Sequence, residues 1–278
     1  MRPATDMSSR GPARPWRVAA SVGAIAIALA GCASPGTTDV GGPTSPSAIS
    51  SVTTTPSSAA GLAIPPVDGP FDWTVDPADF VEGVNNAYFP LTPGTTLTYE
   101  GTADGEREVN RIEVLRKTKE ILGVTCVVVR DTVETDGELA EFTLDWYAQD
   151  VDGNVWYFGE DTAEYDHGTV ATREGSWEAG VKGALPGVVM PADPTVGLAY
   201  SQEHYAGEAE DKGRIFALGE HVTVPYGSFD DVLVTEDWTP LEPKVLERKS
   251  YAPGVGVVFE EIVKGGDEVL KLVDVRGT

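Results

Sequence analysis

Cysteine, histidine and basic residues are all scarce in this sequence. The chain of 278 residues contains 2 Cys and 3 His, and its 20 Lys and Arg stand against 44 Asp and Glu, a net charge of −24. A surface this acidic repels nucleic acids and anionic lipid headgroups, so the composition excludes nucleic acid as a partner. The sequence also lacks a nucleophile elbow, a phosphate-binding glycine loop and paired histidines. We therefore predict no cofactor and no catalytic set of a known kind.

No apolar run is long enough to span a bilayer as a permanent helix, but a shorter one lies near the start. Val18 to Ala30 is a run of about a dozen residues, whereas a spanning helix needs roughly 20. It follows a basic stretch and precedes small residues, which is the order of a secretory signal. Residues 1–31 are therefore predicted to be a signal peptide.

The end of this signal carries a resemblance. Leu29-Ala30-Gly31-Cys32 resembles the lipobox of bacterial lipoproteins, where a peptidase cleaves before a cysteine that carries diacylglycerol. The resemblance implies that the first three residues are recognised by the signal peptidase and that Cys32 is the lipidation site. Two or three acyl chains, at ~0.8 kcal/mol per buried methylene, hold a protein stably on a bilayer. We therefore expect a membrane-anchored, extracytoplasmic protein in contact with the lipid bilayer; an ordinary cleaved signal is the alternative.

The mature chain divides by composition into two parts. Residues 32–69 are mostly Ser, Thr, Pro, Gly and Ala, which cannot bury enough surface to offset ordering, so they are predicted to be a flexible tether. Residues 70–278 are predicted to be one domain. Cys126 lies in a β-branched run and is expected to be a buried small hydrophobe, so an internal disulfide is excluded once Cys32 is acylated.

The domain is predicted to be all-β. Short runs of β-branched and aromatic residues alternate with Gly, Asp-Gly and Pro breaks, which favours a curved antiparallel sheet, either a half-barrel or a sandwich. One short N-terminal helix is expected over residues 76–83, because Asp76 can cap it, Pro77 suits its first position and Gly83 suits its end.

An internal repeat is visible at a near-constant displacement along the chain. The run Gly123 to Val129 lies over Gly227 to Leu233, and Tyr147-Ala148 lies over Tyr251-Ala252. We predict a duplication in which residues 90–175 and 194–276 form two similar meanders around one core.

The clearest hairpin runs from Leu144 to Phe158. With Asp152-Gly153 as a two-residue turn, Tyr147 would face Phe158 and Gln149 would face Trp156. Aromatic residues on both faces indicate that neither face is simply exposed to solvent: either one face packs on the core while the other lines a groove, or the sheet curls so that both are covered. The residues expected to line a ligand site are Tyr147, Trp156, Phe158, Trp146 and Tyr157.

Two acidic tracts offer other chemistry. Asp150, Asp152 and Asn154 resemble the first half of a calcium loop, but the later bidentate Glu is missing, so we predict no metal there and keep the three as candidate ligands only. The tract after the hairpin holds the carboxylates of a second hypothesis, an extracellular hydrolase in which acids of different pKa share the work. These are Glu160, Asp161, Glu164 and Asp166.

Three longer tracts, residues 86–95, 145–150 and 251–256, are similar to those of an uncharacterised group of secreted β-rich bacterial proteins and lipoproteins. That resemblance implies no catalytic residue. The favoured interpretation is a non-enzymatic binding module for an apolar or amphipathic ligand or for an envelope protein; the alternatives are the hydrolase and a calcium-binding structural module.

Overall fold

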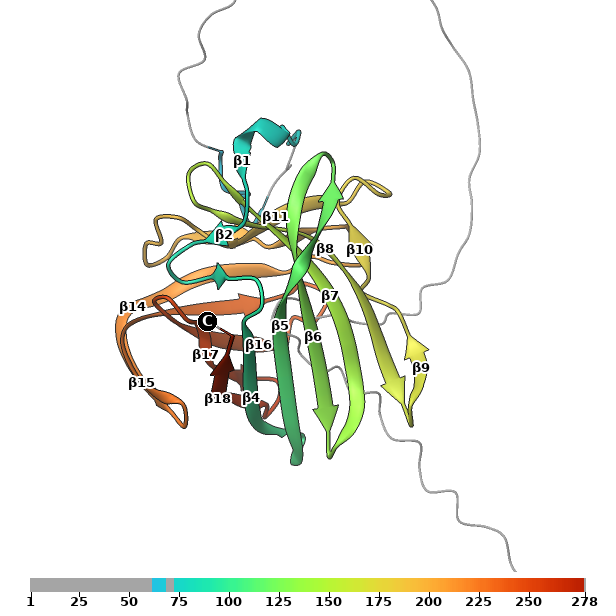
Figure 1. The fold of residues 1–278 in the computed structure, drawn as a ribbon, viewed down its shortest axis with the longest axis vertical. Coiled ribbons are helices and arrows are strands. Elements are labelled where there is room, and N and C mark those ends of the chain that lie inside the picture. The colour runs from blue at the N-terminus through green and yellow to red at the C-terminus, as the bar shows by residue number, and fades with distance from the viewer. Residues whose placement is uncertain (1–61, 69–72, 278) are drawn as a thin grey trace, which may run out of the picture.

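The computed structural model describes residues 62–68 and 73–277, which form an almost entirely antiparallel β structure (Figure 1). The predicted all-β fold with a curved antiparallel sheet is confirmed. The predicted signal peptide, the lipobox with Cys32 and most of the tether lie outside the described residues.

The strands are short at the start of the domain and long in both of its halves. The first half contains β1 (Phe80–Val81), β2 (Val84–Asn85), β3 (Pro90–Leu91), β4 (Thr96–Ala103), β5 (Glu106–Ile121), β6 (Val124–Thr135), β7 (Glu138–Asp150), β8 (Val155–Asp166) and β9 (Thr169–Thr172). The second contains β10 (Trp177–Glu178), β11 (Leu185–Met190), β12 (Ala199–Ser201), β13 (Glu203–His204), β14 (Lys212–Val224), β15 (Gly227–Trp238), β16 (Leu246–Ala252), β17 (Gly256–Lys264) and β18 (Val269–Arg276).

The main sheet nearly closes on itself. Its strands neighbour one another in the order β12-β14-β15-β16-β17-β18-β4-β5-β6-β7-β8-β11-β13, with β1, β9 and β10 attached to β7 and β8 and with β2 and β3 forming a separate pair. The two strands at the ends of this order, β12 and β13, are separated in the chain by Gln202 alone. The edges of the sheet therefore meet, and the sheet encloses an interior like an almost closed barrel.

Tight turns join the long strands of the first half. At Asp104-Gly105 and Asp136-Gly137 both residues have positive φ, with values of 51° and 79° in the first pair and 51° and 84° in the second. Positive φ at both central positions is the requirement of a type I′ turn, whose twist matches that of antiparallel strands. These two Asp-Gly breaks are thus two-residue hairpin turns.

The short helix expected over residues 76–83 does not form. Asp76 does accept a hydrogen bond from Ala78 N, 3.0 Å away, and Pro77 does open the helix, but only one 3₁₀ turn forms, η1 (Pro77–Asp79). From Phe80 the chain pairs with β7 as strand β1. Pairing with an existing sheet edge supplies backbone hydrogen bonds that an isolated short helix cannot match.

Each half of the predicted duplication contains consecutive antiparallel strands, β4 to β8 in residues 90–175 and β14 to β18 in residues 194–276. The duplication itself stays a prediction. The burial of Cys126 on β6 is confirmed, and burial raises the pKa of its thiol to about 12.

Candidate ligand site in a carboxylate-rich interior

The inner face of the sheet carries many acidic side chains. Cross-strand pairing places Asp145 opposite Glu160, and Lys249 opposite both Thr235 and Glu260, so the members of each pair share a face. The buried acidic residues are Glu108, Asp131, Glu141, Asp145, Asp150, Glu160, Glu203, Asp211, Glu236, Asp237, Glu247, Glu260 and Glu268. Within residues 62–68 and 73–277, Lys249 is the one buried basic residue. Buried carboxyl groups therefore greatly outnumber buried cations.

A small pocket opens into this interior and draws residues from both halves of the sheet. Its lining consists of Phe89, Tyr147, Val189, Gln202, Asp237, Lys249 and Tyr251. The ring centroid of Phe89 lies 5.3 Å from that of Tyr147 and 6.4 Å from that of Tyr251. The free space, about 10 Å³ for the centre of a water molecule, is room for roughly one water. The pocket thus combines three aromatic rings with an acid and a base.

The side chain of Lys249 lies among carboxylate groups next to the pocket. Its Nζ lies 2.9 Å from Glu247 Oε2 and 3.6 Å from Asp237 Oδ2. Burial acts to lower the pKa of Lys249, but the negative charges of Glu247, Glu260 and Asp237 outweigh burial and raise that pKa well above its usual value. Lys249 is therefore charged at neutral pH. Burial raises the pKa of Asp237 to about 6, against the opposing effect of Lys249.

A second acidic group lies deeper between β7, β8 and β13. Tyr157 Oη donates a hydrogen bond to Asp145 Oδ1 over 2.7 Å. Burial raises the pKa of Asp145 to about 8, and burial together with the charges of Asp145 and Glu203 raises the pKa of Glu160 well above its usual value. These carboxyl groups therefore retain protons near neutral pH and remain enclosed in neutral form.

The aromatic hairpin β7–β8 forms with a register one residue away from the prediction. Tyr147 pairs with Tyr157 and not with Phe158. The connecting loop consists of residues 151–153 in place of the predicted two-residue turn, and Gly153 within it has a φ of 100°. A loop of this length ends on a residue of positive φ and shifts the pairing by one position.

The predicted aromatic lining is divided between the two faces of the hairpin. On the inner face Tyr157 stacks on Tyr147 with 4.8 Å between ring centroids, and of the five predicted residues Tyr147 alone lines the pocket. On the outer face Trp146 packs under Lys119, whose Nζ lies 3.1 Å from the ring centroid.

Trp156 and Phe158 also belong to the outer face, and both are fully buried. Trp73 stacks on Trp156 at 4.3 Å, and the ring of Phe80 meets that of Phe158 edge-on at 5.4 Å. The segment that precedes the first long strand therefore covers these two side chains, and they belong to the packed core.

In the loop that resembles half of a calcium site, hydrogen-bond donors of the loop itself surround the Asp150 carboxylate. Asp150 Oδ1 accepts hydrogen bonds from the backbone N–H groups of Asp152 and Asn154, and Asp150 Oδ2 accepts from Asn154 Nδ2 and from Trp156 Nε1, all at 2.8–3.0 Å. Asp152 Oδ2 accepts from Leu62 N. With four donors on one carboxylate, Asp150 organises the loop and has no free oxygen for a cation.

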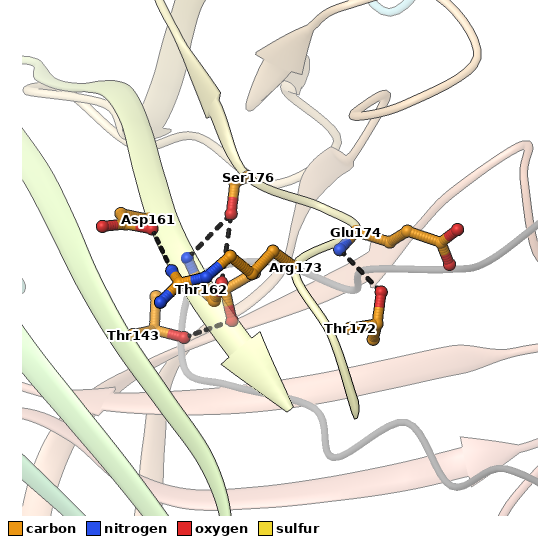
Figure 2. A network of polar contacts seen from close by, with 7 residues as sticks. All are labelled: Thr143, Asp161, Thr162, Thr172, Arg173, Glu174 and Ser176. Carbon is orange, nitrogen blue, oxygen red and sulfur yellow. Dashed lines mark hydrogen bonds and ion pairs between the residues drawn. The ribbon is translucent and has the colours of Figure 1, made fainter. Parts of the chain in front are cut away.

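The four carboxylates of the hydrolase hypothesis do not converge. Glu160 faces the interior, whereas Asp161 Oδ1 accepts a hydrogen bond from Arg173 Nη1 at 2.8 Å on the exposed side (Figure 2). Glu164 is half-buried and Asp166 is exposed at the end of β8. Glu160 meets Asp145 and Glu203 instead of its neighbours in sequence.

The polar contacts around Asp161 connect strands to a loop. Thr143 Oγ1 and Thr162 Oγ1 lie 2.6 Å apart, and Thr162 N donates to Ser176 Oγ over 3.0 Å (Figure 2). These contacts join β7 and β8 to the segment just before β10 and serve the fold.

Of the pocket residues, sequence reasoning identified Tyr147 and missed Phe89, Val189, Gln202, Asp237, Lys249 and Tyr251. A signal for the charged pair existed in the strands themselves, because Asp237 and Lys249 each sit in a run that carries polar residues on both faces. Such a pattern favours a strand in which one polar face is exposed to solvent and the other is enclosed by the sheet.

No protein-family model matches the chain, and no curated protein matches it. A solved structure of a candidate lipoprotein from Parabacteroides distasonis is similar over 69% of this chain and 99% of its own, with 14% sequence identity and a TM-score of 0.38. Among the residues that the structure describes, no helix has the length and apolarity needed to cross a membrane.

Proposed function

We propose that the chain is a lipid-anchored extracytoplasmic binding protein that holds a small amphipathic cation between Tyr147 and Tyr251, in the place of the Phe89 ring, and does no chemistry on it. The observation that carries the proposal is the pocket composition, in which Phe89, Tyr147 and Tyr251 stand together with Asp237, while the charge of Lys249 is balanced by its ion pair with Glu247. Aromatic ring faces attract cations, and the attraction is strongest where the cation is desolvated.

The free space decides where the ligand lies. Room for one water does not admit an organic head group, so the ligand takes the position of the Phe89 ring between Tyr147 and Tyr251. Phe89 is half-buried and belongs to a short segment in which Phe89 N donates to Asn86 Oδ1 over 3.2 Å. Its ring thus occupies the site when no ligand is bound.

The proposed ligand is amphipathic because the pocket contains both aromatic rings and charged groups. A purely apolar molecule would strip water from Asp237 and Lys249 without replacing its hydrogen bonds, which costs about 1–3 kcal/mol for each polar group. A cation with an apolar portion meets the rings with one part and the carboxylate with the other. Of the two ligand classes expected from the sequence, apolar and amphipathic, this argument favours the amphipathic one.

The anchor is tested by Cys32→Ser. The lipobox Leu29-Ala30-Gly31-Cys32 supports acylation at this residue, so the variant is expected to lose its acyl chains and move from the membrane to the soluble fraction. Fractionation of cells followed by mass spectrometry measures both effects, with Cys126→Ser as the matched control. Membrane retention of the Cys32 variant would contradict the proposal.

The ligand class is tested by calorimetric titration of the full chain with choline and with its uncharged isostere 3,3-dimethylbutan-1-ol. Choline is expected to bind and the alcohol to bind about tenfold more weakly or not at all. Phe89→Ala should strengthen choline binding because it empties the site, while Phe229→Ala, which alters an aromatic pair outside the pocket, should not. Equal binding of both probes, or no binding of either to the Phe89 variant, would reject the cation site.

A further inference from the structure

A third acidic group lies where β16, β17 and β18 come together. Glu247 is on β16, Glu260 is on β17, and Glu268 immediately precedes β18. One carboxylate oxygen from each residue lies within 4.8 Å of those of the other two. The three residues are 0%, 1% and 4% exposed. None of them lines the pocket that contains Phe89, but the cluster adjoins it, because Lys249 lines the pocket and forms an ion pair with Glu247.

Glu260 supplies a second observation. Neither of its enclosed carboxylate oxygens receives a hydrogen bond from a donor group, and its side chain meets the carboxyl group of Glu247. Asp150, which is equally enclosed, accepts four hydrogen bonds. Leaving a buried charged group without a partner costs more than the roughly 1–3 kcal/mol of a neutral one. The oxygens of Glu260 therefore face a position where a positively charged group would relieve that cost.

Lys249 does not supply enough charge for this position. Its Nζ forms an ion pair with Glu247 and lies near Asp237 as well. Three carboxylates with one lysine leave two negative charges, which one divalent cation neutralises. Without such a cation, burial and then the charge of Glu247 raise the pKa of Glu260 well above its usual value. The choice for this cluster is therefore between a shared proton and a metal ion.

We propose that Glu247, Glu260 and Glu268 bind one calcium ion inside the sheet. All the donors are carboxylate oxygens, which suit hard cations, and three bidentate carboxylates would supply the six oxygens that calcium requires. Magnesium keeps several of its waters and demands near-ideal octahedral geometry, so a site with almost no solvent exposure favours calcium. Zinc prefers sulfur and nitrogen donors, which these three residues do not offer.

The ion would join three strands at one point. Glu247 and Glu260 belong to paired strands. Glu268 lies in the β17–β18 hairpin loop, and its backbone carbonyl accepts a hydrogen bond from Ile262 N over 3.0 Å. Calcium at this point would fix the β17–β18 hairpin against β16. Because the ion binds only the folded state, it would stabilise that state in proportion to the logarithm of its concentration.

The test uses the full chain in detergent, stripped with chelator and then titrated with CaCl₂ or MgCl₂. Native mass spectrometry is expected to show one calcium per chain, and calorimetry to show calcium binding more tightly than magnesium. Glu260→Gln should weaken calcium binding by at least about tenfold. Glu160→Gln, an equally buried acid outside the cluster, and Asp152→Asn, in the β7–β8 loop, should bind calcium as the parent chain does.

Two results would overturn the proposal. If a shared proton holds the cluster, calcium leaves the melting temperature of the parent chain unchanged, and Glu260→Gln raises that temperature in chelator. If Asp152→Asn abolishes calcium binding while Glu260→Gln does not, the ion belongs to the β7–β8 loop. Should Glu260→Gln fail to fold, Glu268→Gln at the loop end replaces it with the same expectation. Choline binding is measured in the same samples as a separate readout of the proposed function.

Discussion

The indole rings of Trp73 and Trp156 stack at a centroid distance of 4.3 Å with 15° between their planes. This contact brings a residue from before the first strand onto the outer face of β8, where Trp156 is completely buried. The outer aromatic face is therefore closed by the chain's own N-terminal segment. A ligand therefore cannot reach Trp156 from this side.

Trp73→Ala is expected to lower the free energy of unfolding by about 3 kcal/mol, because it removes a large ring from a stacked, largely buried position. Urea denaturation followed by circular dichroism measures the change. Val196→Ala, at a side chain that is 64% exposed, is the control and should change stability by less than about 0.5 kcal/mol. Equal effects would mean that Trp73 does not cover the sheet in solution.

Asp150→Asn is expected to destabilise the fold by about 2 kcal/mol, since an amide nitrogen replaces one oxygen that now accepts from N–H donors. The same urea denaturation applies. Asp152→Asn is the matched control, because Asp152 is exposed and accepts one bond from Leu62 N. A loss confined to the Asp152 variant would contradict the assignment of Asp150 as the organiser of the loop.

Stability should fall as pH rises, the opposite of common acid lability. Burial raises the pKa of Asp145 from an ordinary 3.8 to about 8 and that of Glu108 from 4.5 to about 7. The folded chain therefore binds these protons more tightly than the unfolded chain does. The stabilisation is complete below pH 4 and is lost towards pH 8, by up to about 1.4 kcal/mol per pH unit for each group.

Urea denaturation in chelator at several pH values between 5 and 8 measures this slope. Asp145→Asn should flatten it, because the amide does not titrate. Asp161→Asn is the control, since Asp161 is exposed and paired with Arg173. A stability that rises steadily from pH 5 to pH 8 would show that the interior carboxyl groups ionise freely.

Cys126 should resist alkylation in the folded protein. Its thiol is enclosed, and burial raises its pKa to about 12, so the reactive thiolate is rare at pH 8. Iodoacetamide labelling followed by mass spectrometry should show slow reaction in buffer and rapid reaction in urea. Similar rates in the two conditions would place the thiol at the surface.

The fold class was predictable because hairpin signals are local. A two-residue hairpin turn requires positive φ, which an Asp-Gly pair readily adopts, and alternating β-branched residues favour a strand. The antiparallel sheet can therefore be predicted from neighbours in sequence. The register of β7 and β8 was not predictable in the same way. It depends on the Asp150 carboxylate, which accepts two backbone N–H bonds within the loop and favours three loop residues over two.

The alternation of polar and apolar residues, which identified the strands, did not identify the candidate site. In β7 the polar residues Glu141, Thr143 and Asp145 alternate with Phe142 and Leu144, a pattern that ordinarily assigns the polar set to water. In the structure the polar set is buried, and the two apolar residues are half-buried. Alternation identifies two faces, but closure of the sheet decides which face is enclosed, and closure is not a local property.

Closure depends on one short stretch of chain. β12 and β13 lie at opposite edges of the sheet, and Gln202 alone separates them; its backbone N–H donates to Asp211 O over 2.7 Å. Closure of the sheet also requires that the two halves of the domain pair through β18 and β4. Such pairing joins residues far apart in sequence, which makes folding slow. During that delay the interior acids are still exposed to water and ionised, so the last step of folding must also take up protons or cations from the medium.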